Sequence, residues 1–326
     1  MAVTRKGLPG DGVGRLAQRN DVRVWEGETP PTAEELAQHV AGAEAILAIG
    51  ADVIDDALLD AAGPQLRVVA LSSMGYDAVD LDAVRRHGVV ATHTPNVLAE
   101  TTADLAFALM LMARRRLLDA IDDLRAGNWR GLAMDGYLGL DVYGATLGIL
   151  GYGQIGRALA RRARGFGMPV QFVKPRSMSD EDAAAGPDTA VDRDTLLRTS
   201  DIVSVHVPLS DATRGMIGAA EFAQMKPTAT VVNTARGGIV DEADLIVALR
   251  SGAIHSAGLD VMADEPRSDS ADPLLNESRL VVLPHVGSAT ATTRARMAGL
   301  AADNITAVLA DADAPTPIPG TSAAYR

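Results

Sequence analysis

Residues 145–156 read ATLGILGYGQIG, in which an apolar run leads into three glycines, Gly151, Gly153 and Gly156. The segment at 157–167, RALARRARGFG, has the spacing of an amphipathic helix. This order of strand, turn and helix is typical of a dinucleotide site. Gly151 permits the tight turn, Gly153 lets the backbone approach a pyrophosphate, and Gly156 lets the helix pack closely on the strand.

The turn also contains Gln154 and Ile155, which open the helix, so that its N-terminus is expected to face the phosphates. A lone GxGxxG has low specificity. A second signal follows along the chain. Arg236, Glu265 and His285 each come just beyond a short apolar segment, in an order that hydride transfer to a keto acid can use.

Length and composition indicate a soluble globular protein of about two domains. The chain has 326 residues, 47% of them hydrophobic, and its 30 basic and 42 acidic residues give a net charge of −12. Nucleic acid is not an expected partner, because phosphate binding depends on clustered cations. The cationic run Arg114, Arg115 and Arg116 is predicted to be a solvated helix end rather than a binding patch.

Cysteine is absent, which excludes disulfide bonds, thiolate metal ligands and thiol nucleophiles. Neither a signal-peptide pattern at the N-terminus nor a run of about 18 apolar residues is present. We therefore expect a cytoplasmic protein without membrane association. No metal site is expected, since His and carboxylate residues do not cluster at ligand spacing.

Strand-like and helix-like segments alternate through the first hundred residues. Strands are predicted at 22–25, 45–50, 67–71 and 89–92, and amphipathic helices at 32–42, 53–63 and 80–88. This alternation predicts a parallel α/β sheet. Residues 98–124 are predicted to form one or two helices, and the glycine-rich, aromatic stretch 127–143 an irregular arm that packs against a partner surface.

The alternation resumes at residue 146. Strands are predicted at 146–151, 169–174, 201–208, 229–235, 256–261 and 280–285. Six strands in one mostly parallel sheet suit a doubly wound nucleotide domain. A helix at 290–310 then leads to a proline-rich tail, which is predicted to be flexible.

Five motifs in this order resemble the D-2-hydroxyacid dehydrogenase family. They are MGYD at 74–77, GYGQIG at 151–156, NTARGGIVDEADL at 233–245, GLDVMADEP at 258–266 and LPHVGSAT at 283–290. Within that family the chain is most similar to glyoxylate/hydroxypyruvate reductases. The resemblance implies two Rossmann-like or flavodoxin-like parallel-sheet α/β domains with a cleft between them, and an NAD(P)-dependent oxidoreductase of class EC 1.1.1.-.

The resemblance also implies roles for the catalytic residues. Arg236 would clamp the substrate carboxylate and polarise the keto oxygen, which suits a planar, permanently charged guanidinium. His285 would protonate the carbonyl oxygen as hydride arrives, and Glu265 would hold the imidazole. Backbone N–H groups of Met74 and Gly75 would bind the carboxylate of a small 2-keto acid.

Other positions match the family's cofactor and substrate contacts. Ser288 would add a hydroxyl near the substrate or His285, and Asp260 would accept a hydrogen bond from the nicotinamide carboxamide. The remaining residues implied to line the cofactor site are Thr102, Thr234, Ala235, His206 and Pro208. For Thr102 a helix cap or packing role is an equal alternative.

The residue that ends the second strand of the nucleotide unit indicates which cofactor is used. NAD-dependent relatives carry an acidic residue there, which accepts from the ribose 2′-hydroxyl. This chain has Lys174, with Arg176 two residues on, and these cations would attract a 2′-phosphate. The sequence predicts NADP(H) over NAD(H); the alternative is that both cations are solvated and permit either cofactor.

The domains are predicted to be discontinuous. Residues 1–98 and 288–326 would form the substrate-binding domain, and 99–287 the Rossmann domain with a dimerisation arm. Hinge closure would then assemble the site and exclude water. A homodimer through the helix near 103–124 and the aromatic arm is what the resemblance implies.

Two alternatives stay open within the same fold. A phosphite or phosphonate dehydrogenase is weakly suggested by GLD at 139–141 and Arg294, but Met74 stands where those enzymes carry a lysine. A non-enzymatic, nucleotide-sensing protein like the C-terminal-binding corepressors keeps a similar triad. Fold alone does not separate these functions.

Overall fold

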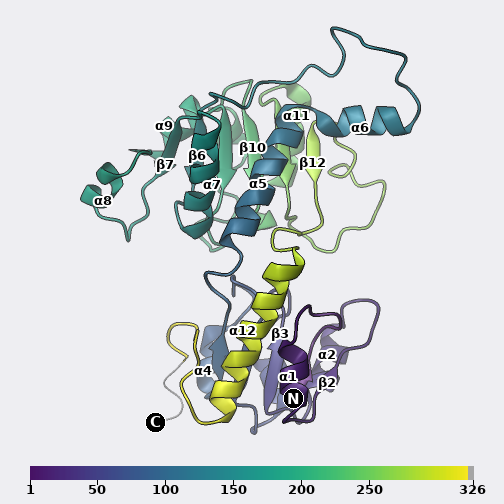
Figure 1. Cartoon of the computed structure of the whole chain (residues 1–326), viewed down its shortest axis with the longest axis vertical. Coiled ribbons are helices and arrows are strands. Elements are labelled where there is room, and N and C mark those ends of the chain that lie inside the picture. Colours follow the sequence, from purple (N-terminus) through teal and green to yellow (C-terminus); the bar gives the residue numbers. More distant parts are fainter. Residues whose placement is uncertain (322–326) are drawn as a thin grey trace. The chain divides into compact units, whose positions relative to one another are not determined.

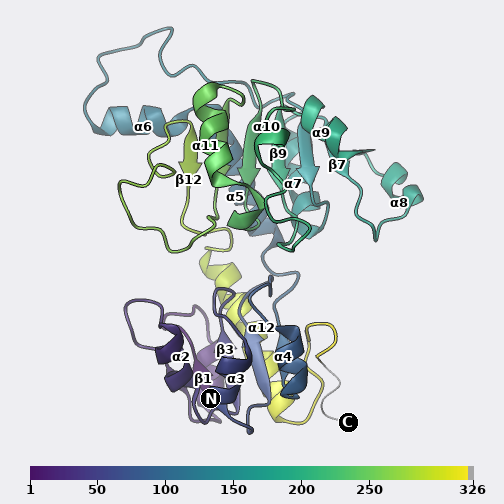
Figure 2. The same ribbon diagram turned by 180° about the vertical axis from the view of Figure 1, so that it is seen from behind.

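A computed structural model describes residues 1–321 of this chain. The backbone forms two compact units, the first from Met1–Leu98 together with the chain from Ser288 onward, the second from Ala99–Gly287. Each unit has its own parallel sheet covered by helices (Figures 1 and 2). The predicted fold class of two parallel α/β domains is confirmed.

The first unit has a five-stranded sheet in the order β2-β1-β3-β4-β5, with every pair parallel. The strands are β1 (Ala2–Val3), β2 (Arg23–Val24), β3 (Ala45–Ala48), β4 (Val68–Leu71) and β5 (Val90–Thr92). The helices are α1 (Gly12–Ala17), α2 (Ala33–Val40), α3 (Asp56–Ala62), α4 (Leu81–Arg86) and α12 (Ala291–Leu309).

Both faces of this sheet are buried, because side chains alternate along each strand. In β3, Ile46 and Ala48 pack with α2, α3 and α4, whereas Ala45 and Leu47 pack with α1 and α12. The unit therefore needs residues from both ends of the chain for its core. α12, which lies near the C-terminal end of the sequence, is therefore part of the first unit.

Two sequence predictions for this unit were wrong. β1 was missed because its two residues, Ala2–Val3, are followed at once by the polar Thr4, Arg5 and Lys6, whereas the equally short β2 lies within the alternating VRVW at 22–25. The tail was predicted to be flexible, but Ile318 is fully buried and its N–H donates to Ala91 O at 2.8 Å, while Thr321 Oγ1 donates to the same carbonyl at 3.0 Å. The tail as far as Thr321 therefore packs on β5; residues 322–326 lie outside the described part.

The second unit has a seven-stranded parallel sheet in the order β12-β11-β10-β9-β6-β7-β8. The strands are β6 (Leu147–Leu150), β7 (Val170–Val173), β8 (Thr189–Val191), β9 (Ile202–Val205), β10 (Thr230–Asn233), β11 (Ser256–Leu259) and β12 (Leu280–Val282). The helices are α5 (Ala99–Arg114), α6 (Leu117–Arg125), α7 (Gln154–Gly165), α8 (Asp180–Ala185), α9 (Arg193–Thr199), α10 (Ala219–Phe222), the 3₁₀ turn η1 (Gly237–Ile239) and α11 (Glu242–Ser251).

Helices cover both faces of this sheet. α5 and α7 contribute to one apolar cluster, and α9, α10 and α11 to the other. The strand order reverses between β6 and β9, which is where open α/β sheets bind ligands. The sequence predicted six strands and missed β8. This edge strand has three residues, of which two are exposed.

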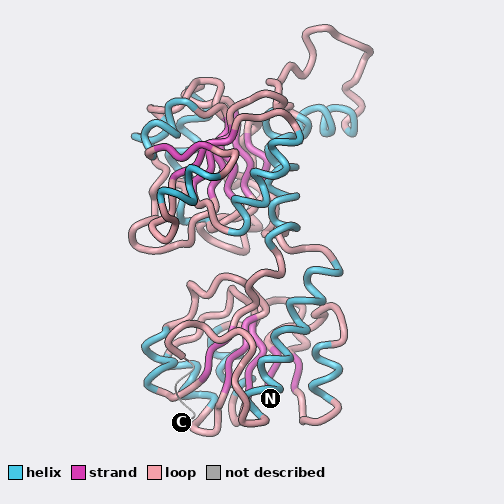
Figure 3. The backbone as a smooth tube through the Cα atoms, turned by 60° about the vertical axis from the view of Figure 1, so that its left-hand side comes forward, coloured by secondary structure: helices cyan, strands magenta, loops and turns pink. Residues whose placement is uncertain are grey.

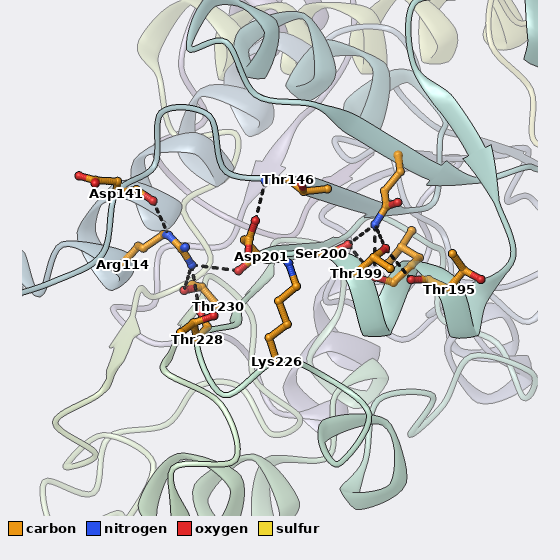
Figure 4. A network of polar contacts seen from close by, with 12 residues as sticks. Arg114, Asp141, Thr146, Thr195, Thr199, Ser200, Asp201, Lys226, Thr228 and Thr230 are labelled. Carbon is orange, nitrogen blue, oxygen red and sulfur yellow. Dashed lines mark hydrogen bonds and ion pairs between the residues drawn. The ribbon is translucent and has the colours of Figure 1, made fainter.

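The cationic run at 114–116 differs from its prediction. Arg114 is buried, and its guanidinium donates to the carbonyl oxygens of Asp141 (2.7 Å), Asp201 (3.0 Å) and Thr228 (2.9 Å), as Figure 4 shows. Burial lowers the pKa of Arg114. The helix breaks at Arg116, which has a φ of +53°, so the predicted helical region is two helices.

After this break the chain exposes many apolar side chains. No side chain of α6 is buried, and the stretch from Ala126 to Val142 has neither helix nor strand, as the tube in Figure 3 shows. Leu132 and Met134 are 90% and 86% exposed. Within residues 1–321, no helix combines the length and apolarity that crossing a bilayer requires.

Candidate active site

Six chemically distinctive residues follow six strands of the second unit. Gly151 follows β6, Lys174 follows β7, His206 follows β9, Thr234 follows β10, Asp260 follows β11, and His285 comes three residues after β12. Because all seven strands are parallel, these positions share the carboxyl edge of one sheet. That edge is where α/β sheets hold their ligands.

The glycine turn has the shape that a dinucleotide needs. Gly151 has a φ of +99°, and a Cβ there would lie 2.5 Å from the backbone of His206; a Cβ on Gly156 would lie 2.4 Å from Gly151 O. A Cβ on Gly153 would meet nothing within 4 Å. α7 begins at Gln154 with no acidic residue in its first turn, so its N–H groups are open to an anion.

A pocket of about 890 Å³ opens beside this turn. Five of the predicted cofactor residues line it: Gly151, Gly153, Lys174, His206 and Pro208. Arg157 and Arg193, which the sequence analysis did not select, line it as well, whereas Arg176 is exposed and is not among the lining residues. The pocket therefore carries three cations, of which one was predicted. Its size and donors fit a dinucleotide.

Lys174 already has partners inside the second unit. Its ammonium group donates to Met178 O at 3.1 Å and pairs with Asp180 at 2.7 Å. The hydrogen bond from Lys174 lowers the pKa of Asp180. A cofactor phosphate that binds Lys174 must compete with this carboxylate.

Tyr152 is a pocket residue that the sequence analysis passed over. Its ring stacks on Phe172 with centroids 3.9 Å apart, and its hydroxyl donates to the buried carboxylate of Asp188, which Arg164 also binds at 2.8 Å. Burial, and then this hydrogen bond, raises the pKa of Tyr152 to about 12. Its place between the two glycines of GYG at 151–153 was the sequence signal that could have identified it.

His206 is held neutral. Burial lowers its pKa to about 4. Its Nε2 lies 2.8 Å from Ser204 Oγ, and its Nδ1 lies 3.5 Å from Thr234 Oγ1. This imidazole therefore contributes no positive charge to the pocket at neutral pH.

Glu265 and His285 form a direct pair. Nδ1 of His285 lies 2.7 Å from Glu265 Oε2, and Glu265 Oε1 accepts from Met262 N at 2.8 Å. Burial would raise the pKa of Glu265, but the bonds from His285 and Met262 and the charge of Arg236 outweigh it and leave the pKa lowered. Glu265 is therefore a carboxylate at neutral pH, and it leaves Nε2 of His285 for a second partner.

Arg236 is brought to this pair by a close approach of two loops. A Cβ on Gly237 would lie 1.8 Å from Met262 C, so the two backbones are in contact. The buried side chain of Asn233 fixes the Arg236 loop, because it donates to Arg236 O at 2.8 Å and accepts from Ala235 N at 3.0 Å. Sequence analysis missed Asn233, although it opens the NTARGG motif.

Asp260 is buried and organises the chain after His285. Its carboxylate accepts from the N–H groups of Val286 and Gly287, both at 2.7 Å, and Thr102 Oγ1 donates to Gly287 O at 3.1 Å. Burial raises the pKa of Asp260 more than these two bonds lower it. Thr102 thus makes a hydrogen bond within the second unit.

The three predicted substrate residues lie in the first unit. The carbonyl oxygens of Met74 and Gly75 accept hydrogen bonds from His93 Nδ1 at 2.8 Å and from Ser73 Oγ at 2.7 Å. Ser288 is half-buried, and its carbonyl oxygen accepts from Thr290 N at 2.8 Å just before α12. The backbone at all three positions is therefore held by bonds within the first unit.

Known proteins match nearly the whole chain. A glyoxylate/hydroxypyruvate reductase B of Serratia proteamaculans is 43% identical over 308 residues, 94% of each chain. A crystal structure of a protein from Thermus thermophilus has a TM-score of 0.89 at 40% identity and covers 97% of this chain and 99% of its own. A Sinorhizobium meliloti structure, described as an NADPH-dependent glyoxylate/hydroxypyruvate reductase with NADP and malonate, has a TM-score of 0.82 at 32% identity and covers 98% of this chain and 97% of its own.

The family model for the NAD binding domain of D-isomer specific 2-hydroxyacid dehydrogenases matches residues 107–287. That range includes the glycine turn, the pocket and the Glu265–His285 pair. The matched range therefore contains the sheet whose carboxyl edge carries these residues. This chain therefore belongs to the D-isomer specific 2-hydroxyacid dehydrogenase family.

Proposed function

We propose that this protein reduces a small 2-keto acid, of the glyoxylate or hydroxypyruvate type, with NADPH as the hydride donor. The observation that carries the proposal is the 2.7 Å bond between His285 Nδ1 and Glu265, at the edge that also holds the glycine turn. The names of the Serratia and Sinorhizobium relatives support the substrate class.

Each residue has a defined task in this reaction. Arg236 binds the substrate carboxylate and draws electron density from the keto oxygen. When bound, the reduced nicotinamide supplies the hydride that the carbonyl carbon accepts. His285 gives its Nε2 proton to the carbonyl oxygen, so keto acid, hydride and proton yield the 2-hydroxy acid. Glu265 keeps the imidazole oriented by holding its Nδ1, so that Nε2 is left for the substrate.

We further propose that the peptide N–H groups of Met74 and Gly75 bind the substrate carboxylate, and that Ser288 adds a hydroxyl contact. In the second unit, Asp260 is proposed to hold the nicotinamide carboxamide, and Thr234 and Ala235 to line the site beside it. The first unit is then the substrate-binding domain and the second unit the dinucleotide-binding domain.

The proposed cofactor preference is NADP(H). Lys174 occupies the strand end where an acidic residue would accept from a ribose 2′-hydroxyl, and it lines the pocket together with Arg157 and Arg193. A 2′-phosphate would take the place of Asp180 on Lys174. Arg176, two residues after Lys174, is exposed and would place a second positive charge beside the 2′-phosphate.

The test is a panel of glyoxylate, hydroxypyruvate and pyruvate with NADPH and with NADH, followed by His285→Ala. We expect NADPH-dependent reduction, and a kcat about 10²- to 10⁴-fold lower in the variant. His87→Ala is the matched control, because His87 also pairs with a carboxylate, Asp56, at 3.2 Å. NADPH binding, followed by its fluorescence, should survive in both variants.

Three outcomes would contradict the proposal. One is that no 2-keto acid is reduced with either nucleotide. Another is phosphite-dependent reduction of NADP+ in place of keto-acid reduction, which would favour the phosphite dehydrogenase alternative. The third is unchanged turnover in His285→Ala, which would remove the imidazole from the chemistry.

We also propose that the protein is a homodimer through the helical region near 103–124, whose last part lies in α6, and the arm at 127–143. Support comes from the exposed apolar side chains of this segment, since exposed patches of this kind mark interfaces. The most exposed are Leu124 (61%), Trp129 (58%), Leu132 (90%), Met134 (86%), Leu138 (63%) and Tyr143 (72%).

Light scattering after size exclusion tests the assembly. The double variant Leu132→Glu, Met134→Glu should give monomers, because two carboxylates cannot be buried at an apolar interface without a large desolvation penalty. Val247→Glu is the control, since Val247 is 65% exposed on α11. A wild-type chain that runs as a monomer would disprove the dimer.

A further inference from the structure

The loop that follows β4 has three successive carbonyl groups tied back into the first unit. Ser73 O accepts from Thr94 N at 2.8 Å, Met74 O lies 2.8 Å from His93 Nδ1, and Gly75 O accepts from Ser73 Oγ at 2.7 Å. Each bond fixes the plane of the peptide to which the carbonyl belongs.

The N–H groups of the same peptides point the other way. In a trans peptide the N–H lies opposite the C=O, so the N–H groups of Met74, Gly75 and Tyr76 face away from the atoms that hold the carbonyls. Among residues 1–321, none of these three N–H groups has a hydrogen-bond acceptor in the protein. Successive N–H groups of this kind form an anion-binding concavity.

The side chain of His93 holds this loop from outside it. A carbonyl oxygen can only accept, so Nδ1 of His93 carries the proton and donates to Met74 O. That bond fixes the peptide whose N–H belongs to Gly75. The imidazole also meets the ring of Tyr76 edge-on, with centroids 5.2 Å apart and planes at 89°.

The position of His93 is itself fixed from the far end of the chain. Its N–H donates to Thr316 O at 3.2 Å, and its carbonyl accepts from Thr316 Oγ1 at 2.6 Å. Thr316 is bound in turn to the buried Asn304 of α12, through bonds of 2.8 and 2.9 Å. The backbone of His93 is therefore anchored before any ligand arrives.

We propose that His93 is a positioning residue for substrate binding. By donating to Met74 O it holds the N–H group of Gly75 in place between those of Met74 and Tyr76, and the concavity of these three N–H groups receives the carboxylate of the 2-keto acid. The inference rests on the proposed function for the identity of the anion. His93 touches neither substrate nor cofactor in this account, so it acts through KM rather than through the chemical step.

The kinetic test compares His93→Leu with His39→Leu. His39 is a matched control in the same unit, since its Nε2 lies 3.1 Å from Val3 O and its ring meets Trp25 edge-on at 5.7 Å. We expect His93→Leu to raise KM for glyoxylate about tenfold or more, with kcat changed less than about twofold and KM for NADPH unchanged. His93→Asn, whose amide can donate to Met74 O, should recover much of the loss.

A binding test separates this inference from the proposed function. Oxalate carries a carboxylate but accepts no hydride, and ¹⁵N-glycine labelling reports on the 31 glycines, with Gly75 assigned through Gly75→Ala. In the wild type and in His39→Leu the Gly75 amide should shift with oxalate to saturation. In His93→Leu that shift should require about tenfold more oxalate.

The outcomes are distinct. If the wild type reduces no 2-keto acid but the Gly75 shift is lost in His93→Leu, the proposed function fails and the role of His93 stands. If the wild type is active and His93→Leu keeps both its KM and its Gly75 shift, the inference is overturned. If His93→Leu does not fold, His93→Phe, which keeps a ring but has no N–H donor, replaces it in the same two measurements.

Discussion

Lys174 shows how one exposed carboxylate can tune a binding site. Asp180 lies 2.7 Å from its ammonium group, and the side chain of Asp180 is 94% exposed. Exposed ion pairs are weak, so a phosphate with two negative charges displaces such a carboxylate readily. If NADPH binds at Lys174 as proposed, its 2′-phosphate therefore has to displace only this weakly held carboxylate.

Asp180→Asn should raise the ratio of kcat/KM for NADPH to that for NADH by about two- to fivefold, because the freed ammonium attracts the 2′-phosphate. Glu181→Gln is the control, as it removes one charge from the same helix without an ion pair to Lys174. Steady-state kinetics with both nucleotides measure the ratio. An equal change in the two variants would assign the effect to net charge alone.

His206 should make stability depend on pH. Its pKa is about 4 in the folded chain and near 6.5 when unfolded, so the unfolded chain binds the proton first as pH falls. The free energy of unfolding should therefore decrease between pH 6.5 and 4, by at most about 3 kcal/mol from this group. His206→Gln should lose less stability over the same range in urea titrations. Parallel curves for the two proteins would contradict the pKa shift.

At the scale of elements, two glycines at the start of α7 have different surroundings. Gly156 faces backbone, since a Cβ there would lie 2.4 Å from Gly151 O, whereas Gly153 faces open space. The first position is needed for packing of helix on strand. The second has room for a side chain in the protein itself, so we expect it to matter only when a dinucleotide binds.

Gly156→Ala should lower the unfolding free energy by about 2 kcal/mol or more, because backbone atoms must move. Gly153→Ala should change it by less than about 0.5 kcal/mol but weaken NADPH binding about tenfold or more, because its methyl group meets the pyrophosphate. Thermal unfolding without cofactor and fluorescence titration separate the two effects. Similar melting temperatures for both variants would refute this account.

On the scale of the whole molecule, the two units differ in how their cores are assembled. Both apolar clusters of the second unit come from residues within 99–287. The clusters of the first unit need Ala301, Ile305 and Ile318 in addition to residues before 98. One unit is continuous in sequence and the other is not.

The fragment 99–287 should therefore fold alone and bind NADPH, since every residue lining the pocket lies within it. The fragment 1–98 should not fold, because it lacks the α12 side chains that cover one face of its sheet. Circular dichroism melts and NADPH fluorescence check both fragments. A cooperative melt of 1–98 would show that α12 is dispensable for this core.

Sequence patterns predicted most of the architecture for a local reason. An apolar run followed by glycines identifies β6 and its turn wherever the rest of the chain lies, and periodicity identifies the helices. The same rules failed at β1 and β8, because β1 is followed at once by Thr4, Arg5 and Lys6 and two of the three residues of β8 are exposed, so neither strand contains an apolar run. They also failed for Arg114, since nothing local shows that three carbonyl groups will surround its guanidinium.

The sequence identified the candidate residues Arg236, Glu265 and His285 because each occurs in a motif. The spacing of the motifs does not show which of these residues are in contact. Glu265 and His285 are 20 residues apart and meet because β11 and β12 are adjacent and parallel. Arg236 lies near enough for its charge to lower the pKa of Glu265, because Gly237 lets its loop touch Met262. Residue types and local order are determined by the sequence itself, through short-range sterics and hydrophobic periodicity. The tertiary structure decides which loops meet, because strands that are distant in sequence must first pair in one sheet. Only that pairing brings the imidazole of His285 to the carboxylate of Glu265.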